Sequence, residues 1–197
     1  MSQPVLMLMD YQEAICRTDG AIGRAGVGGE VERRGVLEKA ARVLAAFRAH
    51  GAPVIHVRVA FDPEYHTMTS ASDRFQGMRR AGLLQKHDPG TRICGEVAPT
   101  EEEPVVTKGC VNPFVGTNLA EKLNAIPHTD LVLGGVATNH VVESTARFAA
   151  DSGHRVIVLE DLCASFTREL HEFAVEQILP SYARVTSSGD YLGAWHE

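Results

Sequence analysis

Two ionisable side chains follow apolar runs of the chain at the points where those runs end. Asp10 comes directly after LMLM, and Lys108 follows EPVVT. A carboxylate beside an apolar run is costly to bury without a partner, and a lysine can keep it ionised or steer its proton. We therefore predict that Lys108 is the partner of Asp10, an arrangement that suits either proton transfer or a structural ion pair.

Other ends of apolar runs carry residues that suit ligand contact. Arg58 can hold a carboxylate through two hydrogen bonds, and aromatic side chains line most small-molecule pockets. The candidate substrate-binding residues are Gln12, Arg58, Phe61, Phe75, Phe114, Thr138 and Asn139.

The elements that must position these residues alternate between short apolar runs and amphipathic segments. The predicted strands are 4–9, 53–59, 104–107, 130–136, 155–159 and 183–186, and the predicted helices are 36–47, 117–124, 140–151 and 168–179. Continuous apolar runs are typical of parallel strands covered on both faces. The pattern predicts one α/β domain over residues 1–197, with ligands at the carboxyl ends of the strands.

Two segments do not fit this alternation. Residues 20–29 read GAIGRAGVGG, with five glycines in ten positions, and we predict a mobile surface loop there, with a lid over the site as the alternative. Residues 62–103 are long, polar and weakly periodic, which is typical of a functional or disordered loop.

Composition excludes several classes of partner. The net charge of −6 argues against a nucleic-acid partner. No apolar run approaches the ~20 residues that span a bilayer, so no membrane partner is expected. The four cysteines lie far apart without a CxxC pair, which favours a reducing, cytoplasmic location over a disulfide framework or a zinc knuckle.

Five motifs, in order along the chain, resemble those of the isochorismatase-like hydrolases: LMLMDYQ, IHVRV, VVTKGCVNPFVGTNL, LVLGGVATNHVVESTARFAAD and VLEDLCAS. The resemblance implies a Rossmann-like three-layer α/β/α sandwich with a six-stranded parallel sheet. It also implies a homodimer or homotetramer and a small-molecule substrate. Asp10 and Lys108 match two members of the family's catalytic set.

The third member of that set does not match. In the motif GVATNHVVEST, Val141 stands where the family's amide hydrolases have their nucleophilic cysteine. The resemblance further implies a cis peptide between Val136 and Ala137. It implies a turn over Val136, Ala137, His140 and Val141 that offers backbone N–H groups to an anion or carbonyl.

A metal triad of the nicotinamidase type is also missing. That triad has the form Asp-x-His with a further histidine, and here Asp62 is followed by Pro63 and Glu64. We therefore predict no catalytic metal and no cofactor.

These observations leave three hypotheses open. The first is a hydrolase without a cysteine nucleophile, in which Asp10 is a general acid or base with Lys108 as its partner. A vinyl ether such as isochorismate would suit it, because its cleavage needs a proton donor and no nucleophile. The second is an amide hydrolase with a relocated thiol at Cys110. The third is a non-catalytic binding or assembly protein that retains the pocket.

Overall fold

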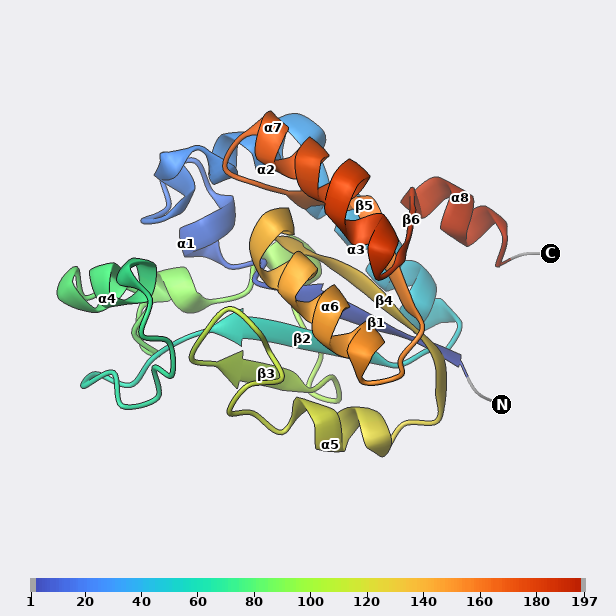
Figure 1. Cartoon of the computed structure of the whole chain (residues 1–197), viewed down its shortest axis with the longest axis horizontal. Coiled ribbons are helices and arrows are strands. Elements are labelled where there is room, and N and C mark those ends of the chain that lie inside the picture. The colour runs from blue at the N-terminus through green and yellow to red at the C-terminus, as the bar shows by residue number, and fades with distance from the viewer. Residues whose placement is uncertain (1–2, 196–197) are drawn as a thin grey trace.

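A six-stranded parallel sheet lies between two layers of helices in the computed structural model, which describes residues 3–195 (Figure 1). The strands are β1 (Gln3–Met9), β2 (Val54–Val59), β3 (Val105–Lys108), β4 (His128–Val136), β5 (Val156–Ala164) and β6 (Arg184–Thr186). Their order is β3-β2-β1-β4-β5-β6, and every neighbouring pair is parallel. The predicted Rossmann-like α/β/α sandwich is therefore confirmed, with the strand order reversing between β1 and β4.

The helices differ in length and in the layer they form. They are α1 (Glu13–Cys16), α2 (Val27–Arg34), α3 (Val36–Ala49), α4 (Asp73–Arg80), α5 (Leu119–Asn124), α6 (Glu143–Asp151), α7 (Arg168–Phe173) and α8 (Ser188–Gly193). Helices α5 and α6 cover one face of the sheet, and α2 and α3 cover the other (Figure 1). Within residues 3–195, no helix is long and apolar enough to cross a bilayer.

Both faces of the sheet are buried, which explains the continuous apolar character of β1. Val5 and Met7 belong to the core cluster under α5 and α6, whereas Leu6 and Leu8 belong to the cluster under α2 and α3. Successive side chains of a strand point to opposite faces, so a strand covered twice must be apolar at every position.

The strand predicted over 155–159 is longer than expected and ends elsewhere. Its pairing with β4 shifts from Leu133–Val158 to Gly135–Cys163, so the irregular stretch between them stays within the strand. Glu160 therefore does not mark the end of β5, which continues to Ala164. A local irregularity of pairing of this kind leaves no mark on the hydrophobic pattern.

The prediction of a mobile surface loop over the glycine-rich segment 20–29 is wrong. It forms a 3₁₀ turn over Gly23–Ala25 and then the start of α2, with Ile22 and Val27 buried. A Cβ at Gly23 would lie 1.8 Å from the carbonyl oxygen of Arg17. Glycine is required there because the backbone packs closely against the chain after α1.

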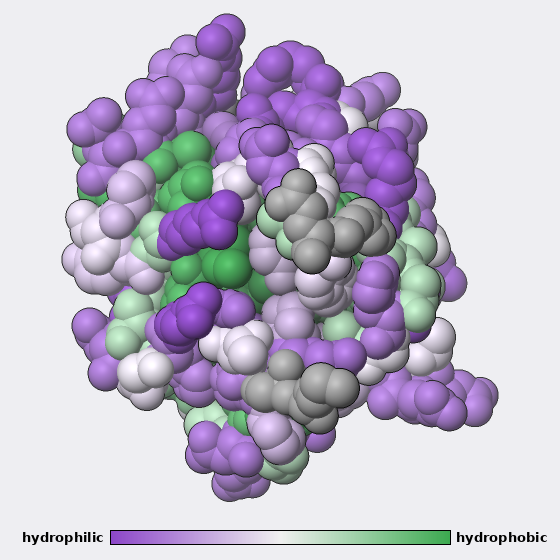
Figure 2. Space-filling view, turned by 90° about the vertical axis from the view of Figure 1, so that its right-hand side faces the viewer, coloured by the Kyte–Doolittle hydropathy of each residue, from purple (hydrophilic) through white to green (hydrophobic). Residues whose placement is uncertain are grey.

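The long segment 62–103 is ordered around α4 and two 3₁₀ turns, Pro89–Thr91 and Gly95–Val97. Its part around α4 lies at the end of the molecule to which β2 and β3 point, and its last residues return to the start of β3, where Glu103 bonds Arg48 (Figure 1). The opposite end is mainly hydrophilic around a hydrophobic strip (Figure 2). Segment 62–103 and the carboxyl ends of the strands therefore enclose the site described next.

Candidate active site

Asp10 leaves β1 in a left-handed turn at the carboxyl edge of the sheet. Its φ is 60°, its N–H donates to the carbonyl oxygen of Val57 over 2.9 Å, and its own carbonyl accepts from the N–H of Gln12 over 2.8 Å. This φ is uncommon for residues other than glycine, and the residues that adopt it cluster at functional sites. The sheet therefore fixes the direction of the Asp10 side chain.

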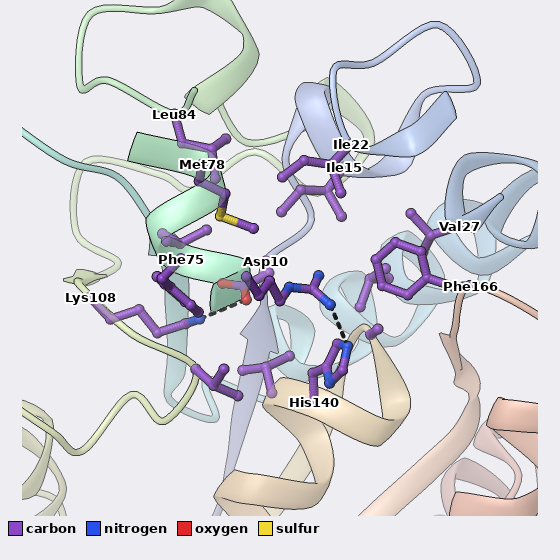
Figure 3. A pocket seen from close by; sticks show the side chains of 16 residues that line it. Asp10, Ile15, Ile22, Val27, Phe75, Met78, Leu84, Lys108, His140 and Phe166 are labelled. Atoms are coloured by element: carbon purple, nitrogen blue, oxygen red, sulfur yellow. Dashed lines mark hydrogen bonds and ion pairs between the residues drawn. The ribbon is translucent and has the colours of Figure 1, made fainter. Parts of the chain in front are cut away.

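Lys108, the last residue of β3, points its ammonium at this carboxylate (Figure 3). Lys108 Nζ donates to Asp10 Oδ2 over 2.7 Å and to the carbonyl of Cys110 over 3.0 Å. Asp10 and Lys108 are only 5% and 3% exposed. Asp10 Oδ1 is buried and has no hydrogen-bond partner among the described residues.

Burial and charge act in opposite directions on Asp10. Desolvation raises the pKa of the carboxyl, and the charges of Lys108 and Arg74 lower it by less, so the net pKa is above its usual value. Lys108 therefore engages Oδ2 of a carboxyl whose pKa is raised, and Oδ1 is left buried without a hydrogen-bond partner among the described residues.

The turn after β4 forms the floor of the same pocket. The Val136–Ala137 peptide is cis, and a π-helical turn over Thr138–Val142 leads into α6. Val136, Ala137, His140 and Val141 all line the pocket. The structure therefore brings this predicted turn together with Asp10 and Lys108.

A guanidinium bonded to an imidazole lies in the same pocket as Asp10. Arg74, near the start of α4, donates from Nη1 to His140 Nε2 over 2.5 Å, and its guanidinium carbon lies 4.9 Å from the centroid of the Phe166 ring. Because Nε2 accepts this hydrogen bond, the ring of His140 is neutral with its proton on Nδ1. Burial, followed by the charge of Arg74, lowers the pKa of His140 to about 4.

Apolar side chains form the remaining walls. The apolar lining of the pocket consists of Ile15, Ile22, Val27, Val59, Phe75, Met78, Leu84, Val111, Val136, Ala137, Val141 and Phe166. A mainly apolar hollow with a few converging polar groups is the usual form of a small-ligand site.

Of the predicted substrate contacts, only Phe75 lies in this pocket. Gln12 is fully buried elsewhere, donating from Nε2 to the carbonyls of Val59 and Thr91 and accepting from the Val59 N–H. Its amide therefore joins β2 to the segment after α4. The prediction that Gln12 lines the pocket is wrong, because its amide is occupied by backbone groups outside it.

Three other predicted contacts also lie outside the lining. The Nε of Arg58 donates to Thr107 Oγ1 over 3.2 Å, between neighbouring strands. Phe61 is completely buried in the core, packed edge-on against Phe75. Phe114 stacks on Phe148 on the α6 side of the sheet, with 4.7 Å between ring centroids.

Thr138 and Asn139 belong to the floor turn, but their side chains bond to other elements. Thr138 Oγ1 and His171 Nδ1 are 2.8 Å apart, and Ser165 Oγ donates to Asn139 Oδ1 over 2.5 Å. These bonds tie the turn to α7 and to the end of β5. The two residues therefore position the turn and do not line the pocket.

None of the four cysteines, all of which the structure describes, lines the pocket. Cys110 is the nearest in sequence to Lys108, but its thiol donates to the carbonyl of Asn112 over 3.3 Å. A thiol aimed at a backbone carbonyl outside the pocket is poorly placed to attack a substrate there.

No group of three or more potential metal ligands converges within residues 3–195. The oxygens of Asp62 are already occupied by the N–H groups of Glu64, His66 and Thr67 and by the Thr67 hydroxyl. These hydrogen bonds hold the pKa of Asp62 well below its usual range and fix the loop that follows β2.

Sequence reasoning missed the residue that gives the pocket its second positive charge. Arg74 belongs to α4, whose single buried residue is Phe75. The spacing of Phe75 and Met78 in RFQGM indicated one apolar helical face within a polar segment, and this was the available signal. Phe166 was missed because the predicted strand ended before the irregular stretch of β5.

The comparisons with known proteins identify one family. A family model described as the isochorismatase domain matches residues 4–190. An uncharacterized isochorismatase family protein, YecD of Escherichia coli, is 29% identical over 189 residues, covering 96% of this chain and 94% of that protein. Ureidoacrylate amidohydrolase RutB of Methylobacterium radiotolerans is 32% identical over 187 residues, covering 88% and 72%.

Solved structures of the same fold give a similar result. An isochorismatase family protein from Burkholderia thailandensis is 27% identical with a TM-score of 0.78, over 99% of this chain and 96% of that one. An isochorismatase family protein from Desulfovibrio vulgaris superposes with a TM-score of 0.86 at 21% identity, over 100% of both chains.

Proposed function

Because the chain belongs to the isochorismatase family of hydrolases, we propose that it hydrolyses small vinyl ethers by proton transfer, without a cysteine nucleophile. Isochorismate, which carries an enolpyruvyl ether, is the test compound for this reaction. The observation that carries this proposal is the buried carboxyl of Asp10, which is bonded to Lys108 through Oδ2 and unpaired at Oδ1.

The chemistry needs one acid and one water. In the fraction of the protein in which Asp10 is protonated, its carboxyl gives the proton to the terminal carbon of the C=C bond, which leaves an oxocarbenium ion and an Asp10 carboxylate. Water adds to the cationic carbon and returns a proton to the carboxylate. The resulting hemiketal then breaks its C–O bond to release an alcohol and a keto acid. Lys108 keeps Oδ2 engaged throughout and stabilises the transient carboxylate.

Arg74 supplies the charge that such a substrate requires. Its guanidinium lies at the pocket with one N–H bond to neutral His140, which leaves other N–H groups for a carboxylate. An enolpyruvyl group carries a carboxylate beside the carbon that becomes cationic. Arg74 would therefore bind the carboxylate and position the C=C bond toward Asp10.

The residue at position 141 supports a route without a nucleophile. Val141 lines the pocket where the motif resemblance leads one to expect the cysteine of an amide hydrolase. Valine can neither attack a carbonyl nor give up a proton, so a covalent thioester is closed there. Protonation of a vinyl ether needs no such intermediate.

Amide hydrolysis is the second candidate, because named relatives include ureidoacrylate and maleamate amidohydrolases. It would require the thiol of Cys110, which is bonded to Asn112 and does not line the pocket. A non-catalytic pocket is the third candidate and would bind these compounds without turning them over.

The test is to incubate the purified protein separately with isochorismate, maleamate and ureidoacrylate, and to measure pyruvate and ammonia release. We expect pyruvate from isochorismate, unaffected by iodoacetamide. Asp10→Asn should reduce turnover by ~10²–10⁴-fold, the usual contribution of a general acid. Asp161→Asn is the matched control, because Asp161 binds Ser188 outside the pocket.

Each contrary result identifies an alternative. Ammonia release that is abolished by iodoacetamide and by Cys110→Ala would replace the vinyl-ether reaction with amide hydrolysis. Saturable binding of these compounds without any product would favour the non-catalytic pocket. Full turnover in Asp10→Asn would refute the role of Asp10.

A further inference from the structure

The pocket has two chemically different ends (Figure 3). Asp10, Lys108 and His140 lie at one end together with Arg74. Ile15, Ile22, Met78 and Leu84 gather at the other, where the side chains drawn carry no charge. A ligand that fits both ends must therefore carry an anionic or reactive head and an apolar tail.

A second hollow lies behind the apolar end, and Leu84 lines both spaces. Ile15 and Ile22 line the inner pocket, whereas their chain neighbours Ala14 and Ala21 line the outer hollow. The chain at these two positions and the side chain of Leu84 therefore form the wall between the two spaces. Charged and apolar side chains both line the outer hollow beyond that wall: Glu13, Arg17, Asp88 and Arg92, with Ala14, Ala21, Leu83 and Pro89.

Leu84 is held in place by its neighbours and not by its own conformational preference. Its φ is 59°, in the region that favours glycine, and it is only 3% exposed. Its carbonyl accepts from the Phe61 N–H over 2.8 Å, and the preceding carbonyl of Leu83 accepts from the Tyr65 hydroxyl over 2.8 Å. Strained residues that the surroundings fix in this way cluster at ligand contacts.

We propose that Leu84 determines substrate length by closing the apolar end of the pocket. The site then takes a short amphiphilic carboxylate, with its head at Arg74 and its tail ending against Leu84. This inference deepens the proposed function by naming the substrate class, and it rests on that function only for the identity of the head group.

The test measures binding and does not need turnover. The probes are straight-chain carboxylates of three to ten carbons, titrated calorimetrically into the wild-type protein and Leu84→Gly. Each methylene buried in an apolar site strengthens binding about fourfold, which corresponds to ~0.8 kcal/mol. We expect this gain to stop at a certain chain length in the wild type and to continue for at least two more carbons in Leu84→Gly.

Two further variants make the result specific. Leu83→Ala is the matched control, because Leu83 lines only the outer hollow and should leave the limiting length unchanged. Glycine is used at position 84 because it adopts positive φ without strain. If Leu84→Gly does not fold, Leu84→Asn replaces it, since asparagine tolerates this φ and its amide should weaken binding of the longest tails.

The same limiting length in the wild type and a folded Leu84→Gly, or unweakened binding of the longest tails in Leu84→Asn, would overturn the inference. So would an equal shift in Leu83→Ala, or no saturable binding of any carboxylate. A length limit that moves in Leu84→Gly, in a protein that releases no pyruvate from isochorismate, would uphold the inference and refute the proposed reaction. Pyruvate release from isochorismate, together with the same length limit in the wild type and Leu84→Gly, would support the proposed reaction and overturn the inference about Leu84.

Discussion

Removing either Asp10 or Lys108 alone should lower the free energy of unfolding strongly. Removing both should lower it by much less than the sum of the two single losses. The two side chains are 7% and 2% exposed, and 2.7 Å separates Lys108 Nζ from Asp10 Oδ2. Removing one partner of such a buried pair typically costs ~3–5 kcal/mol, because the remaining charge is left in a poorly solvated site. We expect Asp10→Asn and Lys108→Met each to lower the free energy of unfolding by an amount of this order at pH 7.

The double variant Asp10→Asn/Lys108→Met leaves neither charge. Replacing a buried pair with apolar groups of similar size is often neutral or stabilising, but the asparagine amide at position 10 would stay buried without a partner, which costs ~1–3 kcal/mol. We therefore expect the double variant to lose no more stability than either single variant, far less than the sum of the single effects. The assay is urea unfolding followed by circular dichroism for the four proteins of the cycle.

The pH dependence of stability in Lys108→Met provides an independent test of the same reasoning. In Lys108→Met, burial still raises the pKa of Asp10, and the lysine charge that opposed this rise is gone. A carboxyl whose folded pKa lies above its unfolded value of 3.8 favours the folded state at low pH and loses that contribution as pH rises through the folded pKa. The loss of unfolding free energy in Lys108→Met, relative to the wild type, should therefore be smaller at pH 5 than at pH 7.

Two results would refute this reasoning. Single variants that each cost less than ~1 kcal/mol would mean that water solvates the pair. A double variant whose loss equals the sum of the single losses would mean that the charges do not interact.

Three other predictions concern the elements around the site. Gly23→Ala should lower the free energy of unfolding by ~1–3 kcal/mol, because its Cβ would lie 1.8 Å from a carbonyl oxygen, whereas Gly29→Ala, with nothing within 4 Å, should be neutral or stabilising in thermal melts. Thr138→Val should cost ~1–3 kcal/mol in urea unfolding by leaving the buried ring of His171 without its bond, and Thr138→Ser should restore stability. Because His140 has a pKa of about 4 in the folded protein against 6.5 ordinarily, it should make the protein more stable as pH rises from 4 to 6.5. His140→Gln should weaken that dependence by ~1–3 kcal/mol across the same interval, and an unchanged pH profile would exclude a neutral, half-buried ring.

The sequence alone determined the architecture and the central pair. Apolar runs alternating with helical patterns indicated parallel strands covered on both faces, and the structure confirms the α/β/α sandwich. Asp10 and Lys108 could be paired because each ends a strand, and the carboxyl ends of parallel strands lie at one edge of the sheet. Such features depend on local periodicity and on strand polarity, which the order of residues carries directly.

Tertiary structure decided which side chains reach the pocket. Gln12 and Arg74 show the difference. Gln12 closely follows β1, but its amide bonds backbone groups of other elements. Arg74 lies 64 positions after Asp10 in the sequence, and its charge acts on Asp10 in the pocket. Phe166 reaches the pocket because an irregular stretch extends β5 past its apolar run. The direction of a side chain is set by hydrogen bonds and packing with segments distant in sequence, and neither residue type nor spacing records those partners.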